Sequence, residues 1–253
     1  MAVHVEDDGP VRVVVLDRPE ARGAVDGAHA AALVAAFTEL EERADLCVGV
    51  LTGSDGHFCS GADLKAVSAG TMPAAAPGEG PGPMGPTRLQ LSKPVVAAVE
   101  GHAVAGGLEL ALWCDLRVAS ETAVFGVFCR RWGVPLIDGG TVRLPRVVGQ
   151  GVALDLVLTG RPVGAQEALR LGLANRVVPA GEARAAAVAL AHELAALPQL
   201  CLRQDRASLL GQWGLSVEDA LAAEWAHGLV SLTEAAQGAA RFAAGHGRHG
   251  TSA

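Results

Sequence analysis

The sequence is poor in aromatic residues. Only 4% of its 253 residues are aromatic and none is tyrosine, whereas half are hydrophobic. A core built from such a chain must pack small and branched aliphatic side chains, alanine among them. The length suits one large domain, or a core with a small helical appendage.

Positive charge is also scarce. The chain has 20 lysines and arginines against 27 acidic residues, which gives a net charge of −7. A nucleic-acid-binding protein needs a basic surface, so we predict no nucleic-acid partner. An anionic small molecule would have to be held by local cations and backbone dipoles.

The cysteines and the apolar runs exclude two further classes. The five cysteines form an odd set without a CxxC or zinc-ligand spacing, so no metal site is predicted. The apolar run 94–116 is interrupted by Glu100, His102, Glu109 and Asp115, which is unlike a membrane span. No signal-peptide pattern begins the chain. We therefore expect a soluble, cytoplasmic protein with no membrane partner.

The segment 95–110 carries the strongest chemical signal. An apolar strand over 95–99 leads into Gly-His-Ala-Val-Ala-Gly-Gly, and a helix then begins with Glu109 in its first turn. Backbone N–H groups at a helix start have no partner within the helix and can receive an anion. This pattern predicts an oxyanion hole near Gly106, with Glu109 as an acid/base group three residues further on.

A second small-residue turn has the same character. The segment 58–64, Phe-Cys-Ser-Gly-Ala-Asp-Leu, follows an apolar strand predicted over 48–52. Its free N–H groups and those of the first turn could clamp one carbonyl oxygen if the fold brings the two turns together.

The remaining pattern divides the chain in two. Further strands are predicted at 116–119, 123–125 and 175–178, and helices alternate with them, whereas nearly everything after Ala180 reads as helix. We expect an α/β core over 1–180 and a helical region over 181–253. Ser216 with Asp219 resembles a capping box for a helix to about Leu229, and Thr233 is predicted to cap the last helix. The Gly/His-rich tail from Gly245 is expected to fray.

One segment, 69–86, is rich in glycine, proline and alanine. Its five prolines exclude a regular helix. The composition on its own favours a disordered surface loop.

Together these motifs resemble the crotonase superfamily, the enoyl-CoA hydratase/isomerase group, over nearly the whole chain. The matching segments, in order, are 18–22, 58–64, 92–101, 125–126, 138–140, 158–160 and 168–175. The resemblance implies an α/β fold, with a crotonase-like core of repeated ββα units and a C-terminal helical trimerisation region. It also implies a homotrimer, or a hexamer formed as a dimer of trimers. In the family, the region that corresponds to 69–86 covers the acyl pocket, so a mobile lid is the second interpretation of that segment.

The resemblance implies an acyl-CoA thioester as the small-molecule substrate. No separate cofactor is expected, because coenzyme A is part of that substrate. The N–H groups of Ala62 and Gly106 would hold the thioester oxygen as an enolate forms. Glu109 matches one of the two carboxylates that hydratases of this family use to activate water.

The resemblance also suggests how coenzyme A is bound. The cations proposed for its phosphates are Arg22, Lys65 and Lys93. Backbone groups at Ser60, Ala62, Asp63 and Leu64 would receive the adenine. Phe242 matches an aromatic residue that packs on coenzyme A, often from a neighbouring subunit. His102 lies within the turn that precedes Gly106 and is interpreted as structural.

The chain departs from the hydratase pattern at Cys129, where the second glutamate would stand. A thiol with an ordinary pKa of about 8.5 is mostly protonated at neutral pH and cannot hold water as a carboxylate does. Cys129 is interpreted as a pocket-lining residue or a weak proton donor. Arg130 and Arg131 beside it could lower its pKa.

Asp138 also has two interpretations. It is either the N-cap of a helix that begins near Gly139 or a working aspartate of the kind found in some family isomerases. Our first prediction is an enoyl-CoA hydratase. The alternatives are an enoyl-CoA or dienoyl-CoA double-bond isomerase that uses Glu109 and Asp138, and an acyl-CoA-binding protein without catalysis.

Overall fold

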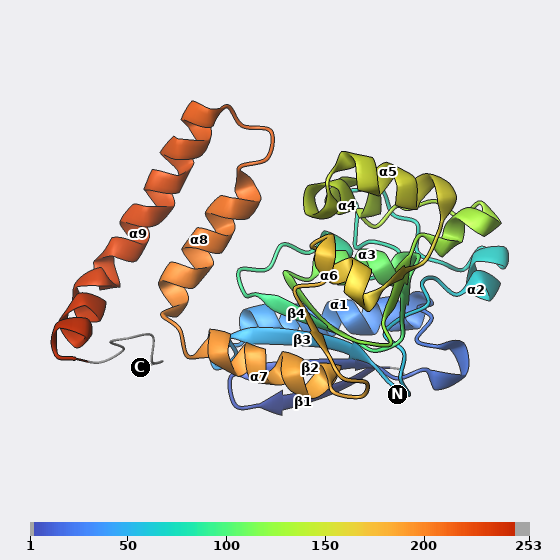
Figure 1. Ribbon diagram of the computed structural model, residues 1–253, viewed down its shortest axis with the longest axis horizontal. Helices are drawn as coiled ribbons and strands as arrows, with labels where there is room; N and C mark the ends of the chain where they lie inside the picture. Colours follow the sequence, from blue (N-terminus) through green and yellow to red (C-terminus); the bar gives the residue numbers. More distant parts are fainter. Residues whose placement is uncertain (1–2, 246–253) are drawn as a thin grey trace. The chain divides into compact units, whose positions relative to one another are not determined.

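A computed structural model describes residues 3–245. Residues 3–178 contain a six-stranded sheet, which Figure 1 shows among the surrounding helices. The strand order is β1-β2-β3-β4-β6-β9. β1 and β2 form an antiparallel hairpin, and the other neighbours are parallel. The bounds are β1 (Val3–Asp8), β2 (Val11–Leu16), β3 (Val48–Gly53), β4 (Val95–Val99), β6 (Leu116–Ser120) and β9 (Arg176–Val178).

Both faces of this sheet are covered by helices. Alternate residues of a strand point to opposite faces, so Val14 and Leu16 pack with α1 (Gly27–Glu42), whereas Val13 and Val15 pack with α7 (Ala183–Ala195). Because the middle strands are buried on both sides, they are continuous apolar runs rather than alternating ones. Figure 1 shows α1 and α7 on opposite faces of the sheet.

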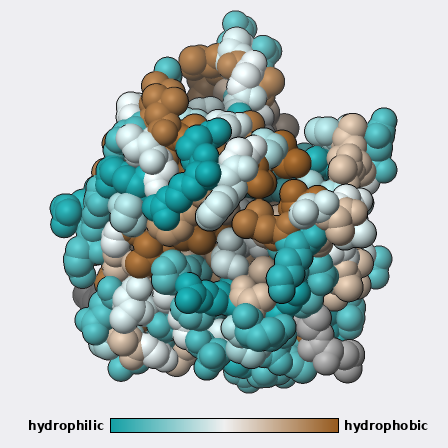
Figure 2. Space-filling view, turned by 90° about the vertical axis from the view of Figure 1, so that its right-hand side faces the viewer, coloured by the Kyte–Doolittle hydropathy of each residue, from teal (hydrophilic) through white to brown (hydrophobic). Residues whose placement is uncertain are grey.

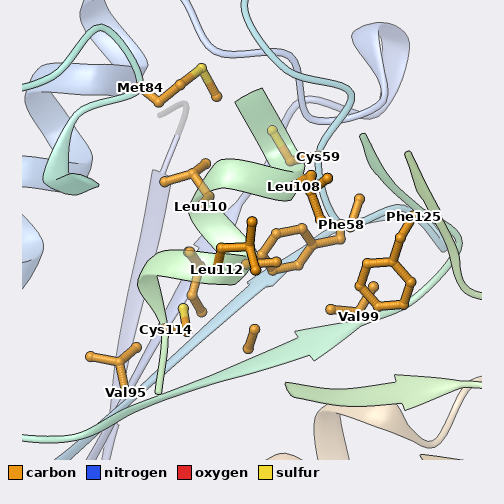
Figure 3. Close-up of a cluster of buried hydrophobic side chains, with 14 of the residues drawn as sticks. Phe58, Cys59, Met84, Val95, Val99, Leu108, Leu110, Leu112, Cys114 and Phe125 are labelled. Carbon is orange, nitrogen blue, oxygen red and sulfur yellow. The ribbon is translucent and has the colours of Figure 1, made fainter. Parts of the chain in front are cut away.

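A second, three-stranded sheet holds the turn that precedes α3. It has the order β5-β7-β8, with β5 (His102–Val104), β7 (Val124–Gly126) and β8 (Val163–Gly164). α3 (Gly106–Trp113) follows β5 and is buried from its first residue almost to its end. Figure 3 shows Leu108, Leu110 and Leu112 of α3 among core side chains that include Phe58 and Phe125.

Short helices surround this core. They are η1 (Pro19–Ala21), α2 (Leu64–Ser68), η2 (Pro86–Arg88), η3 (Phe128–Trp132), α4 (Gly140–Val148), α5 (Gln150–Thr159) and α6 (Ala165–Arg170). The strands predicted near 48–52, 95–99 and 116–119 are confirmed within one residue, and the mixed α/β class with a C-terminal helical region is confirmed.

The chain divides into two compact units, the second of which begins at Ala196. This boundary lies after the predicted one at 180, because α7 packs on the sheet and belongs to the first unit. The second unit consists of α8 (Gln199–Gly211) and α9 (Val217–Ala243), which have no buried residues. Large apolar side chains are exposed on it, including Trp213, Trp225 and Leu232.

The predicted cap at Ser216 is confirmed, but the helix that follows it is longer than predicted. Ser216, whose Oγ accepts a hydrogen bond from the N–H of Asp219, is the N-cap of α9. Thr233 lies within that helix, so the predicted break at Thr233 was wrong. The tail predicted to fray lies beyond the described residues except for Gly245.

No single helix among residues 3–245 is long and apolar enough to cross a membrane. The consecutive helices α7 and α8 pass such a test only when joined, by length and composition alone.

Candidate active site

The two predicted turns lie side by side. Cys59 pairs with Ala103 of β5 in a parallel bridge, and its N–H donates to the carbonyl of His102 at 2.8 Å. Three residues later, Ala62 pairs in the same way with Val25. The segment 59–63 is thus held between β5 on one side and the turn after η1 on the other.

This arrangement leaves two N–H groups without partners. Val25 exchanges hydrogen bonds with the carbonyl of Gly61 and the N–H of Asp63, so the N–H of Ala62 points to the other edge of the segment. Gly106 is the first residue of α3, where the helix supplies no acceptor. Within the described part of the chain, neither the N–H of Ala62 nor that of Gly106 donates a hydrogen bond.

Glycine makes the contact between the turns possible. A Cβ on Gly61 would lie 2.9 Å from the Cβ of Ala105 and 3.0 Å from the nitrogen of Gly106, and the φ of Gly61 is +101°. A Cβ on Gly107 would lie 2.1 Å from the carbonyl oxygen of Cys59. Any larger residue at either position would push the turns apart.

The backbone is strained where α3 begins. Ala105 has φ +54° and ψ −124°, a conformation that residues with a Cβ rarely adopt and that costs about 1–3 kcal/mol. Its N–H donates to Gly126, and its carbonyl accepts from Leu108 and Glu109. These bonds fix the backbone that aims the N–H of Gly106.

Ala62 and Gly106 line a cavity of about 250 Å³ in the first unit. Its polar side chains are those of Ser60, Glu109, Cys129 and Asp138, and its other lining residues are mostly apolar. Several of the apolar ones are also exposed, among them Leu64, Val67, Trp132 and Ile137. These exposed apolar residues suit the mouth of the cavity to an apolar chain. Figure 2 shows hydrophobic side chains at the surface between hydrophilic ones on one face of the molecule.

Glu109 is the most deeply buried carboxylate of the cavity, with an exposed fraction of 2%. Its Oε1 accepts the N–H groups of Asp138 at 2.9 Å and Gly140 at 2.8 Å. Burial raises its pKa to about 7; the Gly140 hydrogen bond opposes this shift, and the charge of Asp138 adds to it. No described residue bonds to Oε2, so this oxygen is available to a ligand.

Asp138 is held by the segment before η2. Its Oδ1 accepts the N–H of Met84 at 3.1 Å and the hydroxyl of Thr87. Burial raises its pKa, whereas the hydrogen bond from Thr87 opposes the rise. The N-cap interpretation was wrong, because the N-cap of α4 is Gly139 and no side chain caps that helix. Arg143 donates to the carbonyls of Asp138 and Thr87 and so joins the two segments.

The Pro/Gly-rich segment has two parts. Residues 76–79 are exposed, but residues 82–87 are buried. Met84, with an exposed fraction of 1%, lies directly over the turn, and a Cβ on Gly106 would lie 2.6 Å from its sulfur. A disordered surface loop is therefore wrong for 82–87, which forms a wall of the cavity.

Cys129 lines the cavity from η3 and is 6% exposed. Burial, followed by the charge of Glu109, raises the pKa of its thiol. The charge of Arg130 opposes this rise without reversing it. The Nε of Arg130 bonds to the carbonyl of Val157, and Arg131 lies over the ring of Phe128. Arg130 therefore acts in the predicted direction, but burial and Glu109 outweigh it, and the pKa of Cys129 is raised rather than lowered.

The residues predicted to contact coenzyme A lie on both units of the chain, near the 59–64 turn and on α9. Arg22 and Lys65 are exposed, and the carbonyl of Arg22 accepts the N–H of Ser60. The side chain of Asp63 caps α2 and pairs with Arg18. Leu64 begins α2, and Phe242 is an exposed residue of α9 in the second unit.

Lys93 was predicted wrongly as a phosphate ligand. It is 3% exposed, and its Nζ donates to the carbonyls of Leu40 and Arg43. The last carbonyls of a helix need donors, and the end of α1 obtains them from this ammonium group.

Sequence reasoning also missed Met84, Thr87 and Arg143, which position Asp138, and Trp132 at the mouth. No local pattern marks them, because they reach the site from segments far apart in the sequence.

The fold and the cavity define an enzyme of the crotonase class. Residues 6–242 match the family model described as enoyl-CoA hydratase/isomerase, and the chain belongs to that family.

Relatives and solved structures agree with this assignment. The chain is 38% identical over 201 residues to an enoyl-CoA hydratase of Mycobacterium tuberculosis, covering 76% of this chain and 74% of the relative. It is 39% identical over 195 residues to a carnitinyl-CoA dehydratase of Salmonella typhi, with the same coverage. The crystal structure of an enoyl-CoA hydratase from Mycobacterium marinum superimposes with a TM-score of 0.90 at 36% identity, covering 96% of this chain and 95% of that one.

Proposed function

We propose that the protein is an enoyl-CoA hydratase that works with one catalytic glutamate, Glu109. The observation that carries this proposal is the cavity in which the unpaired N–H groups of Ala62 and Gly106 occur together with the free Oε2 of Glu109. Two fixed donors in a largely apolar cavity suit a thioester oxygen that gains negative charge.

The mechanism follows from these groups. The thioester carbonyl accepts both N–H groups, which stabilise the enolate formed when water adds to the β-carbon. Glu109 accepts a proton from that water and delivers one to the α-carbon. A carboxyl with a pKa of about 7 populates both protonation states at neutral pH, as a group that takes and returns a proton requires.

Cys129 leaves this hydratase without a carboxylate at the position of the family's second glutamate. A neutral thiol gives attacking water no negative acceptor, so we expect hydration to be slower than after Cys129→Glu.

The test is the loss of conjugated-enone absorbance from crotonyl-CoA with the parent protein and the Glu109→Gln and Cys129→Glu variants. Glu109-dependent loss in the parent supports the proposal. Absorbance that stays constant in the parent and falls only with Cys129→Glu would refute single-glutamate hydration.

A second candidate reaction is double-bond isomerisation of an enoyl-CoA or dienoyl-CoA. The observation that favours it is the second carboxylate, Asp138, whose Oδ2 is bonded to no described residue. Two carboxylates can move a proton between two carbons without water. If isomerisation is the reaction, a β,γ-enoyl-CoA should become conjugated without gain of water, and Asp138→Asn should abolish this change. Membership of an enzyme family argues against the third prediction, a binder without catalysis.

We also propose the predicted contacts with coenzyme A and the predicted assembly. Arg22 and the backbone at Ser60, Ala62, Asp63 and Leu64 would receive the nucleotide, and Phe242 would pack on it from another subunit. The exposed apolar side chains of α8 and α9 support a homotrimer, or a hexamer as a dimer of trimers. Native mass spectrometry of the parent and of Trp225→Glu would test this, with a shift to monomer expected in the variant.

A further inference from the structure

We propose that Cys129 is a nucleophile that captures α,β-unsaturated acyl thioesters, its sulfur adding to the β-carbon to give a reversible covalent adduct. This inference rests on the proposed function, because it uses the same cavity and the same pair of N–H donors.

The position of the thiol supports this role. All five cysteines are within the described residues and are free thiols, and Cys129 is the one that lines the cavity. Cys59 and Cys114 are fully buried in the core, and Cys201 is exposed on α8. Cys129 is thus the thiol that a ligand in the cavity would meet.

Glu109 supplies the base that a buried thiol needs. The two groups line one cavity, and the charge of Glu109 is one cause of the raised pKa of Cys129. A neutral thiol is a weak nucleophile until its proton is removed. Glu109 has an exposed fraction of only 2%. Its Oε2 has no partner among residues 3–245 and is free to accept that proton.

The N–H groups of Ala62 and Gly106 provide the independent sign of a ligand. They are fixed, unpaired donors on two residues that line the same cavity. A thioester carbonyl placed on them is polarised, and its conjugated β-carbon becomes electrophilic.

The step balances without any further reagent. The thiol proton passes to Glu109 as a carbon–sulfur bond forms between Sγ and the β-carbon. The electron pair of the carbon–carbon π bond moves toward the thioester oxygen, which is stabilised as an enolate by Ala62 and Gly106. Glu109 then gives the proton to the α-carbon. Removal of the same α-proton by Glu109 reverses the addition.

The raised pKa of Cys129 makes this capture depend on the substrate. Without a ligand the thiol stays protonated and is a poor target for oxidants. Saturated acyl thioesters have no electrophilic β-carbon and bind without reaction. The expected substrate class is therefore conjugated enoyl thioesters.

Intact-protein mass spectrometry after an acid quench tests this proposal. The full-length parent is mixed with crotonyl-CoA, or with butyryl-CoA as the saturated control. Cys201→Ser is the matched variant that keeps the cavity unchanged, and Cys129→Ser removes the proposed nucleophile. We expect the mass of one whole crotonyl-CoA to be added to the parent and to Cys201→Ser. Neither butyryl-CoA nor Cys129→Ser should give this mass, and Glu109→Gln should slow its appearance roughly 100-fold or more.

Three results would overturn the proposal. One is an adduct that carries the acyl group without coenzyme A, which would indicate acyl transfer. The second is an unlabelled parent that still binds butyryl-CoA and hydrates crotonyl-CoA, which would leave the proposed function intact. The third is an unlabelled parent that neither binds butyryl-CoA nor hydrates crotonyl-CoA, which would refute both the capture by Cys129 and the proposed function. Binding of butyryl-CoA to Cys129→Ser shows that this variant is folded.

Discussion

The cavity has two walls that are built differently. The first wall, residues 59–64 and 105–109, is shaped by backbone, through parallel bridges, a strained Ala105 and glycine contacts too close for any other residue. The second wall, residues 82–87 and 127–138, is shaped by side chains, with Cys129 and Asp138 facing the same space. A backbone wall tolerates almost no substitution, whereas a side-chain wall can change its chemistry without changing the fold. We infer that the first wall fixes the class of substrate and the second decides the reaction.

The largest expected effect comes from the one reactive side chain of the first wall. Glu109→Gln keeps the size of the residue but removes the base, so kcat/KM for crotonyl-CoA should fall roughly 10²–10⁴-fold. Steady-state kinetics check this, and binding of butyryl-CoA serves as the control for folding. Full activity in the variant would indicate that the base is not Glu109 but a residue of the second wall.

The second prediction concerns the backbone of the first wall. Gly107→Ala places a methyl group against the carbonyl of Cys59 and should lower the free energy of unfolding by about 1–3 kcal/mol. The matched control is Gly151→Ala on α5, where no heavy atom lies within 4 Å and alanine should stabilise the helix by up to about 1 kcal/mol. Urea unfolding of both variants measures the contrast. Equal effects would mean that the contact between the turns is not tight.

The third prediction tests how the second wall adjusts the first. The charge of Asp138 is one cause of the raised pKa of Glu109, so Asp138→Asn should lower that pKa. If ionised Glu109 is the active form, activity in the parent should rise with pH through about 7. In the variant the rise should occur at lower pH, by about one pH unit or less. If activity rose at the same pH in the parent and the variant, the charge of Asp138 would have no effect on the pKa of Glu109.

The last prediction concerns stability. The pKa of Glu109 is about 7 in the folded protein and 4.5 as an ordinary carboxyl. The contribution of Glu109 to the free energy of unfolding is therefore fully present below about pH 4.5 and is lost as the pH rises through about 7. Glu109→Gln lacks this titration, so the difference in unfolding free energy between parent and variant should shift against the parent over that range. Denaturant titrations at pH 5 and pH 8 compare the two, and a constant difference would contradict the raised pKa.

The sequence was a better guide to the first wall than to the second. Turns, strands and a helix start leave local marks, and the strand at 95–99 is where the pattern predicted it. Asp138 was ambiguous because its partners, Met84 and Thr87, lie far away in the sequence. Lys93 misled for a similar reason, since an exposed and a helix-capping lysine look alike in sequence. Long-range contacts between side chains have no local signature, and they make up the second wall.

The anchoring of the two carboxylates has a consequence for redesigning the enzyme. Glu109 depends on N–H groups of Asp138 and Gly140, and Asp138 depends in turn on Met84 and Thr87. A design that replaces part of this loop to accept a different acyl chain should therefore leave residues 82–87 unchanged. The exposed residues 76–79 carry none of these anchoring bonds, and they are the place where insertions and library diversity can be introduced at little cost to the chemistry.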